Sequence, residues 1–197
     1  MAKRVFVSAD WKESHDMHSC DKEVVDRIRK WRDDKRYGVD IICTDEVHGS
    51  VTEKPDCRRC EIKGECGRFI DWSGIVIIVV GDNTITKSAG SCDGVSCSPA
   101  YSGQDKKGCK YKYKPSPDNP ANDVLDGLGK SYLEYEIMKA IMSKKSIILV
   151  FNSMRKEEHW IPSLYKQHTV NELCRFPFWK DKEHTQDCYQ DMKGYLQ

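Results

Sequence analysis

The sequence has no long run of apolar residues and no excess of charge of one sign. Its longest strongly apolar stretch, Ile75 to Val80, is far shorter than the roughly 20 residues that a membrane-spanning helix needs. Its 32 basic and 31 acidic residues leave a formal net charge of +1. We therefore expect no membrane partner, and the total charge gives no argument for a nucleic-acid partner.

A targeting segment and internal repeats are also missing. The first residues, Met-Ala-Lys-Arg-Val-Phe-Val-Ser, pass directly into a strand pattern without the apolar core and cleavage site of a signal peptide. We therefore expect a cytoplasmic protein. With 197 residues, 39% hydrophobic and 32% charged, the chain is long and apolar enough for a folded domain with one core.

Cysteine is plentiful, with ten residues, but no complete metal-binding pattern is present. A reducing cytoplasm disfavours structural disulfides, so the cysteines are expected to be free core thiols, metal ligands or redox groups. Cys57 and Cys60 have the spacing of half a zinc knuckle, whereas Cys66 falls on an apolar helix face. Free thiols are the favoured interpretation, with no metal and no cofactor required. The alternative is a shared zinc site with these ligands: Cys57, Cys60, Cys92, Cys97 and Cys109.

Strand patterns alternate with helix patterns along the chain. The continuous apolar run 75–80 is typical of a strand that is covered on both faces. Alternation of this kind predicts a parallel sheet with right-handed crossovers. We expect an α/β, flavodoxin-like three-layer fold with the strand order 2-1-3-4-5. The expected strands are 5–8, 39–43, 75–80 and 147–151, and the expected helices are 22–32, 56–70 and 131–143.

The pattern weakens after residue 152. We expect a helical turn at 170–174, an edge strand at 176–179 and a short helix from Asp181 onward. The whole chain, 1–197, is predicted to be one domain. It would contain a cysteine-containing insertion at about 85–130, after the third strand, and a C-terminal elaboration at about 152–197.

The predicted strand order marks a ligand-binding edge. In such a sheet the switch point lies between the first and third strands, and ligands bind outside the carboxyl ends of the strands there. Ala9 to Trp11 and Gly81 to Thr84 are the corresponding loops. Their polar residues are expected ligand contacts. The simpler interpretation is that they are ordinary loop residues, and that Asn83 and Thr84 cap a helix.

Two further segments partly match nucleotide-binding patterns. Residues 127–131, Gly-Leu-Gly-Lys-Ser, resemble the end of a phosphate-binding loop, but Val124 stands where that motif needs a glycine. Ser131 is better explained as the cap of the following helix. Residues 106–114 interleave lysine with tyrosine, a pattern that can bind phosphates and stack bases. A solvated insertion explains them equally simply, and we favour it.

Four segments, taken in order, resemble the TIR-like family. They are Arg4 to Ser8, Ile75 to Thr84, Tyr132 to Ile137, and Lys145 to Ile148. The likeness covers roughly residues 4 to 152 in pieces and is nearest to the bacterial branch that includes the Thoeris anti-phage defence proteins. The resemblance implies an enzyme that cleaves NAD at the nicotinamide–ribose bond and releases an ADP-ribose-derived signal.

The resemblance also implies site residues. Glu136 occupies the position of the catalytic glutamate and Tyr132 that of an aromatic residue, tryptophan in the family pattern. Glu134, two positions away, would face another side of the helix and lie at the surface. Together with the strand-end loops, the expected substrate-binding residues are Ser8, Asp10, Trp11, Asp45, Asn83, Thr84 and Tyr132.

One carboxylate is chemically sufficient for this reaction. Ordinary glycosidases need a second carboxyl group to protonate the leaving oxygen. Nicotinamide leaves a cationic pyridinium as a neutral molecule and needs no proton. A single glutamate can therefore hold the ribose hydroxyls and stabilise the developing positive charge.

The expected partners follow from the resemblance. NAD would be the substrate, the chain would self-associate through TIR-like surfaces, a phage-derived trigger would activate it, and a small-molecule signal would reach a downstream effector. Two alternatives remain open. One is a non-catalytic TIR-like interaction or sensor module. The other is a nucleotide- or nucleic-acid-binding flavodoxin-like protein that uses the strip at 106–114.

Overall fold

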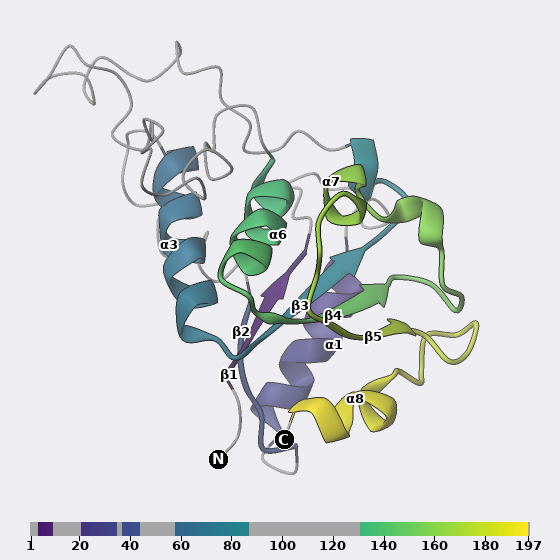
Figure 1. Ribbon diagram of the computed structural model, residues 1–197. Coiled ribbons are helices and arrows are strands. Elements are labelled where there is room, and N and C mark those ends of the chain that lie inside the picture. Colours follow the sequence, from purple (N-terminus) through teal and green to yellow (C-terminus); the bar gives the residue numbers. More distant parts are fainter. Residues whose placement is uncertain (1–3, 10–20, 35–36, 44–57, 87–130, 197) are drawn as a thin grey trace, which may run out of the picture.

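The computed structural model describes residues 4–9, 21–34, 37–43, 58–86 and 131–196 (Figure 1). In these ranges five strands form one sheet in the order β2-β1-β3-β4-β5, and all neighbouring pairs are parallel. The predicted α/β, flavodoxin-like order 2-1-3-4-5 is therefore confirmed. The strands are β1 (Arg4–Ser8), β2 (Asp40–Cys43), β3 (Ile75–Val80), β4 (Ser146–Phe151) and β5 (Glu172–Pro177).

Helices cover both faces of the sheet and complete the three layers (Figure 1). The first layer contains α1 (Lys22–Asp33) and α8 (Tyr189–Leu196). The second contains α3 (Arg58–Trp72), α6 (Tyr132–Met142) and the short α7 (Ser163–Lys166). Two 3₁₀ turns, η1 (Thr84–Thr86) and η2 (Glu158–Trp160), follow β3 and β4.

Alternation along the strands divides the core into two clusters. Val5, Val7 and Ile77 pack against the α1–α8 layer, whereas Phe6 and Ile78 pack against the α3–α6 layer. Every residue of β3 is buried, as expected for a strand covered on both faces. Each such side chain contributes about 1.5–3 kcal/mol when it leaves water, so the central strands hold the layers together.

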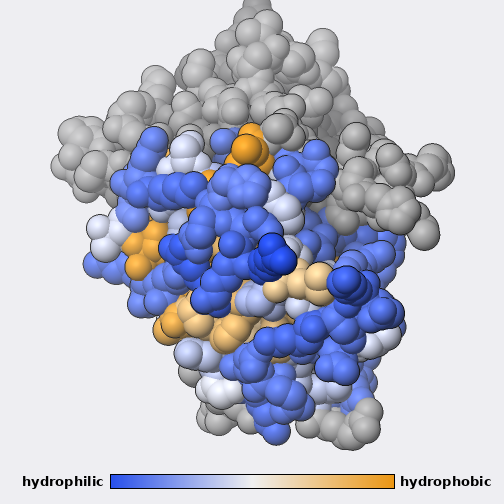
Figure 2. Space-filling view, turned by 90° about the vertical axis from the view of Figure 1, so that its right-hand side faces the viewer, coloured by the Kyte–Doolittle hydropathy of each residue, from blue (hydrophilic) through white to orange (hydrophobic). Residues whose placement is uncertain are grey.

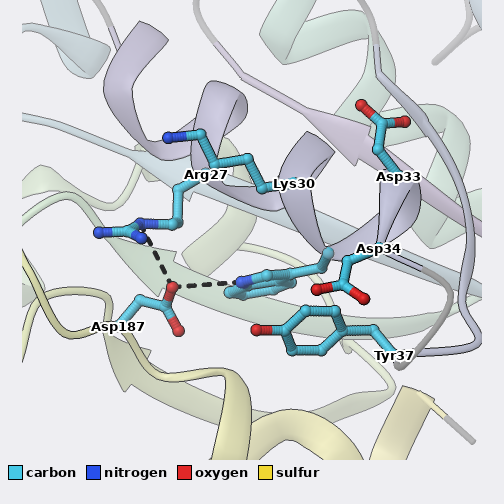
Figure 3. Close-up of a pocket in the computed structure, with 7 residues that line it drawn as sticks. Arg27, Lys30, Asp33, Asp34, Tyr37 and Asp187 are labelled. Atoms are coloured by element: carbon cyan, nitrogen blue, oxygen red, sulfur yellow. Dashed lines mark hydrogen bonds and ion pairs between the residues drawn. The ribbon is translucent and has the colours of Figure 1, made fainter.

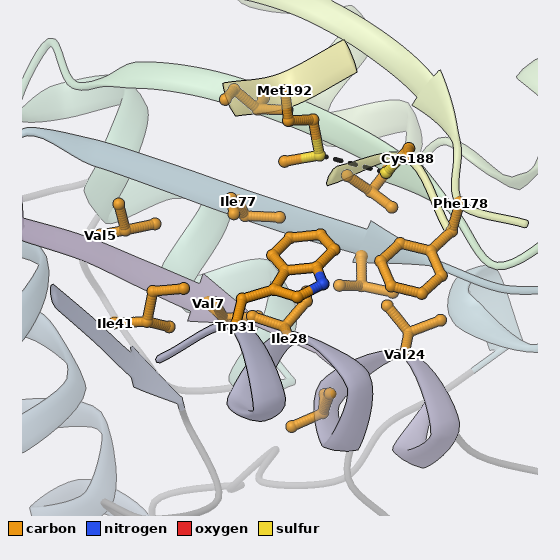
Figure 4. Packing of buried hydrophobic residues seen from close by; sticks show 14 of the residues in the cluster. Val5, Val7, Val24, Ile28, Trp31, Ile41, Ile77, Phe178, Cys188 and Met192 are labelled. Atoms are coloured by element: carbon orange, nitrogen blue, oxygen red, sulfur yellow. Dashed lines mark hydrogen bonds between the residues drawn. The ribbon is translucent and has the colours of Figure 1, made fainter. Parts of the chain in front are cut away.

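The α1 side of the core is built on helical spacing. Val24, Val25, Ile28 and Trp31 are the buried residues of α1, as a 3.6-residue period requires. Trp31 lies among the strand side chains with its ring 5.6 Å from that of Phe178 (Figure 4). The predicted helix at 22–32 is thus confirmed, and it ends one residue later.

The C-terminal third corrects two expectations. Residues 170–174 do not form a helical turn, because β5 begins at Glu172 and pairs with β4. The expected edge strand at 176–179 overlaps β5 only at its first two residues; Trp179 instead makes an isolated antiparallel bridge with Asp187. This segment forms a strand because its backbone hydrogen-bonds to β4, and such contacts with a distant segment cannot be read from local propensity.

The final helix also begins later than expected, at Tyr189 rather than Asp181. The Asp181 carboxylate accepts hydrogen bonds from the backbone N–H groups of Thr185 and Gln186. An aspartate that binds the backbone ahead of it offers an alternative to helical bonding. His184, at φ +54°, takes a left-handed conformation inside the same turn.

No helix in the described ranges is both long and apolar enough to cross a membrane. Figure 2 shows hydrophilic residues over most of one side of the molecule, with separate hydrophobic areas between them. Residues 87–130 lie outside the described ranges, and they include most of the expected insertion and the whole lysine–tyrosine strip. The single-domain assignment and the cytoplasmic location stay predictions.

Candidate active site

The site begins at the carboxyl ends of β1 and β3, which are neighbours in the sheet. Ser8 is the last residue of β1 and pairs in register with Ile78 of β3. Its side chain lies on the same face of the sheet as Phe6, toward α3 and α6. The predicted switch point is therefore occupied by a fully buried hydroxyl group.

Helix α6 is positioned by a capping box. The Ser131 hydroxyl accepts a hydrogen bond from the backbone N–H of Glu134 at 3.1 Å, and the Glu134 carboxylate accepts one from the backbone N–H of Ser131 at 2.8 Å. These two bonds satisfy backbone N–H groups at the start of the helix, which have no partner within the helix. The prediction that Ser131 is the cap is confirmed. Glu134 lies at the cap, partly buried rather than at the open surface.

Glu136 faces a different side of the helix from Glu134, as predicted, and meets Ser8. The Ser8 hydroxyl donates a hydrogen bond of 2.5 Å to Glu136 Oε2. Both residues are buried, and Glu136 is only 1% exposed. The expected catalytic residue and one expected substrate-binding residue are thus brought together.

Helix α3 packs beside the Ser8–Glu136 pair. Gly67 allows close approach to α6, because a Cβ there would lie 2.8 Å from the Tyr135 hydroxyl oxygen. The neighbouring Cys66 is fully buried. Burial raises the pKa of the Cys66 thiol well above its ordinary value, and the charge of Glu136 and a hydrogen bond to it raise that pKa further. Cys66 is therefore a neutral thiol beside the carboxylate.

A lysine and a tyrosine pair with each other on the same two helices. Lys63 of α3 is only 5% exposed, and its ammonium nitrogen lies 5.9 Å from the centre of the Tyr132 ring. That distance is within the range of a cation–π interaction. Tyr132, an expected substrate-binding residue, is partly buried. The sequence analysis missed Lys63, because a lysine inside a helix pattern is usually at the surface.

The loop after β3 is closed by its own side chains. The Thr84 hydroxyl accepts a hydrogen bond from the backbone N–H of Gly81 at 2.7 Å. The Asn83 amide donates one to Asp82 Oδ1 at 2.8 Å. Thr84 is buried and is the first residue of η1; its hydroxyl bonds the N–H of an earlier residue and not one inside the turn, so the interpretation that Asn83 and Thr84 cap a helix stays a prediction. A role for Asn83 or Thr84 in substrate binding stays a prediction.

A second buried carboxylate lies at the same edge of the sheet, and sequence analysis missed it. Asp21, which precedes α1, is 4% exposed. Its Oδ1 accepts a hydrogen bond from the Asn152 amide at 3.0 Å, and Asn152 Oδ1 accepts one from the Trp179 indole at 2.9 Å. A Cβ on Gly81 would lie 2.5 Å from Asp21 Oδ1. This chain ties the loops that follow β3, β4 and β5 to the start of α1.

A cavity of about 690 Å³ lies on the α1–α8 side, away from Ser8 and Glu136 (Figure 3). Arg27, Lys30, Tyr37 and Asp187 are among its lining residues. Arg27 Nε lies 3.4 Å from Asp187 Oδ2, and the Trp31 indole donates a hydrogen bond to the same carboxylate. Arg27, Trp31 and Asp187 are therefore engaged with one another.

Several predicted site residues cannot be located. Asp10, Trp11 and Asp45 lie outside the described residues, as do Cys57, Cys92, Cys97 and Cys109. The backbone of Cys60 is part of α3, but its side chain is not described. Among the described residues, no group of three or more His, Cys, Asp or Glu side chains could hold a metal ion. The zinc alternative and the expectation of free thiols at these positions therefore stay untested.

Comparison with known proteins gives one similar structure. No protein-family model matches the chain, and no curated protein matches it. A 2-deoxyribosyltransferase from the psychrotolerant bacterium Bacillus psychrosaccharolyticus has a TM-score of 0.46 and 12% sequence identity, over 95% of this chain and 94% of that chain. Similarity at this level concerns the fold alone, so the function is argued from the site.

Proposed function

We propose that the chain is a TIR-like enzyme that cleaves the bond between nicotinamide and ribose in NAD, with Glu136 as the catalytic carboxylate. The observation that carries the proposal is the buried Ser8–Glu136 hydrogen bond at the carboxyl edge of the sheet. Burying an ionisable group costs free energy, and ionisable groups in perturbed surroundings are frequent at functional sites.

The chemistry needs one bond to break. The C1′–N bond of the nicotinamide riboside cleaves, and its electron pair leaves with nicotinamide, which becomes neutral. The ribose then carries an oxocarbenium-like positive charge. Glu136 would accept hydrogen bonds from the ribose hydroxyls and stabilise that charge. Water, or an atom of the same nucleotide, then bonds to C1′, and any proton it loses passes to solvent.

Ser8 would be a positioning residue in this reaction. Its hydroxyl holds one carboxylate oxygen of Glu136, so the side chain keeps one rotamer between β1 and α6. A ribose hydroxyl that reaches the carboxylate would join or replace Ser8 as a donor. Cys66, a neutral thiol against the same group, keeps the surroundings weakly polar, and a fixed charge acts more strongly in such surroundings.

Nicotinamide release from NAD by purified protein tests the proposal. We expect the Glu136→Gln variant to lose activity by about 100-fold or more, the usual cost of removing a group that stabilises the transition state. Glu134→Gln is the matched control, because Glu134 lies on the same helix and is bonded to the cap at Ser131. Equal activity in wild type and Glu136→Gln would overturn the assignment.

The biological setting is proposed from the resemblance to the Thoeris branch. The chain would act in bacterial anti-phage immunity, self-associate, respond to a phage-derived trigger and release an ADP-ribose-derived signal. Expression in a susceptible bacterium should then lower phage yield for the wild type and not for Glu136→Gln. Protection that survives this substitution would show that any immune role does not need the carboxylate.

A non-catalytic TIR-like module is the second candidate, and the burial of Glu136 at 1% exposure favours it. A buried Ser–Glu pair can simply tie α6 to β1. In that case Glu136→Gln, which keeps a hydrogen-bond acceptor, would leave partner capture unchanged, and the wild type would release no nicotinamide. Nicotinamide release that depends on Glu136 would exclude this candidate.

A further inference from the structure

We propose that Asn152 is a positioning residue for the loop after β3, residues 81–84, and through this loop for the substrate, and that it acts by way of the buried carboxylate of Asp21. The loop follows the last residue of β3 and contains two of the expected substrate-binding residues, Asn83 and Thr84. The effect on the substrate rests on the proposed function, whereas the effect on the loop does not.

Asn152 directly follows β4 and bonds to three other segments. Its backbone N–H donates a hydrogen bond of 2.9 Å to the carbonyl oxygen of Val80, the last residue of β3. Its side-chain amide donates one of 3.0 Å to Asp21 Oδ1 and accepts one of 2.9 Å from the Trp179 indole. One residue thus joins the end of β3, the start of α1 and the segment after β5.

The partners of Asn152 fix the orientation of its amide. An indole N–H can only donate, so the amide oxygen faces Trp179 and the amide NH₂ group faces Asp21. Trp179 is itself held, because it is 3% exposed and its backbone N–H bonds to the carbonyl oxygen of Ser153 at 3.2 Å. Asparagine therefore fits both neighbours, whereas aspartate has the same shape but nothing to donate to Asp21.

Asp21 connects this amide to the loop. A Cβ at position 81 would lie 2.5 Å from Asp21 Oδ1, the same oxygen that Asn152 bonds, so this oxygen lies against the Gly81 backbone. Gly81 in turn closes the loop, since its N–H donates to the Thr84 hydroxyl at 2.7 Å and its carbonyl oxygen accepts from the Thr84 N–H at 3.1 Å. A displaced Asp21 carboxylate would therefore disturb both bonds.

An exchange of donor and acceptor tests this path. In Asn152→Asp two carboxylates would meet, and like charges at hydrogen-bond distance repel each other. Adding Asp21→Asn reverses the pair, because the new amide at position 21 can donate to the new carboxylate at position 152, which still accepts from Trp179. Such a cycle isolates the interaction between the two positions from their separate effects.

Hydrogen exchange of the Gly81 and Thr84 amides, measured by NMR at neutral pH, reports on the loop without any substrate. In Asn152→Asp we expect these amides to exchange at least about tenfold faster relative to the amides of α6, as for the loss of one hydrogen bond. The double variant should return most of the protection. Equal exchange in wild type and Asn152→Asp, or no recovery in the double variant, would overturn the inference.

Two further variants separate this path from a general loss of stability. Asn171→Asp makes the same substitution at the opposite end of β4, where the amide bonds to the Ser146 hydroxyl, and it should leave the loop amides as they are in the wild type. Trp179→Phe removes the indole donor without adding a charge and should speed their exchange. An equal effect of Asn171→Asp, or no effect of Trp179→Phe, would contradict the inference.

Kinetics with NAD separates this inference from the proposed function. In Asn152→Asp the KM for NAD should rise by about three- to tenfold and recover in the double variant, with kcat little changed, because Glu136 lies on α6 in the other helical layer. If the loop amides respond but the wild type releases no nicotinamide, the positioning of the loop stands and the proposed function fails. If nicotinamide is released with the same KM in all variants, the inference fails alone.

Discussion

The two helical layers bury polar groups in different ways. On the α1–α8 side, Asp21, Asn152 and Trp179 form a chain in which each side chain bonds to the next. On the α3–α6 side, Glu136 is held by a hydroxyl and lies beside a thiol. In the first arrangement the polar side chains bond to one another, and they connect the loops after the strands to the start of α1.

The second arrangement gathers chemically different groups around one carboxylate. The Ser8 hydroxyl and the Cys66 thiol lie against Glu136, and on the same two helices the Lys63 ammonium group faces the Tyr132 ring. Such diversity is typical of a site that binds a ligand, whereas the α1–α8 chain is typical of a structural network. Two buried carboxylates at one sheet edge thus have different expected roles.

The largest expected effect is a difference in enzymatic activity between variants of these two carboxylates. Glu136→Gln should lower kcat for nicotinamide release by about 10²–10³-fold, whereas Asp21→Asn should stay within a few-fold of the wild type, because Asn can still accept the hydrogen bond from Asn152. Parallel rate measurements on the folded proteins check this. If Asp21→Asn is the more damaging change, the roles assigned to the two layers are reversed.

The next effect compares two glycines that allow close contacts. Gly81→Ala would place a methyl group 2.5 Å from a carboxylate oxygen of Asp21, and relief of that overlap should cost about 1–3 kcal/mol of unfolding free energy. Gly67→Ala should cost less, because alanine favours the helix by about 1 kcal/mol and the Tyr135 hydroxyl 2.8 Å away ends a side chain that can shift. Urea unfolding of both variants measures the difference. A larger loss in Gly67→Ala would contradict it.

Each layer also contains a buried thiol, which predicts a pH effect on stability. Burial raises the pKa of Cys66 and of Cys188 above their ordinary values. The folded state therefore favours the neutral thiols, and this preference contributes to the free energy of unfolding. The contribution is complete below pH about 8.5 and is lost as the pH rises toward the folded-state pKa. The loss is up to about 1.4 kcal/mol per pH unit for each thiol.

The test is the slope of unfolding free energy between pH 9 and 10.5, measured with urea. Cys188→Ala should lessen the slope by about one thiol's contribution, up to about 1.4 kcal/mol per pH unit. Cys66→Ala should do the same. In Glu136→Gln the Cys66 contribution should largely remain, because burial is the larger cause of its raised pKa. An unchanged slope in both cysteine variants would refute the explanation. Cys174, partly exposed with a pKa of about 11, contributes a smaller background.

The smallest expected effect concerns the start of α6. Ser131→Ala removes the acceptor for the Glu134 backbone N–H and should cost about 1 kcal/mol of stability. The variant should keep its activity per folded molecule if the cap only holds the helix. Thermal unfolding and the NAD assay, measured together, check both statements. A loss of activity far larger than the loss of folded protein would instead indicate that the cap contributes to the site.

Local signals explain what the sequence could predict. The apolar run of β3, the spacing of Val24 and Trp31 in α1, and the cap at Ser131 each depend on neighbouring residues. The strand order followed from their alternation, and it correctly made β1 and β3 neighbours in the sheet. Glu136 and Ser8 were both expected at the site from the resemblance and the topology.

Contacts between residues that are far apart in the chain explain what the sequence could not predict. Ser8 and Glu136 are 128 positions apart, so their bond depends on the packing of α6 over β1. Lys63 and Asn152 have no local pattern that marks them as buried and bonded. The fifth strand was misplaced because its partners are in β4, and the turn at Asp181 because one side chain competes with a helix.

The most direct test of the central claim is a mass spectrum of NAD after incubation with the wild type and with Glu136→Gln. We expect free nicotinamide and an ADP-ribose product, linear or cyclic, with the wild type, and intact NAD with the variant. Nicotinamide mononucleotide with AMP would show cleavage at the pyrophosphate instead. That result, or the same nicotinamide yield from both proteins, would contradict the assignment of Glu136 to the nicotinamide–ribose bond.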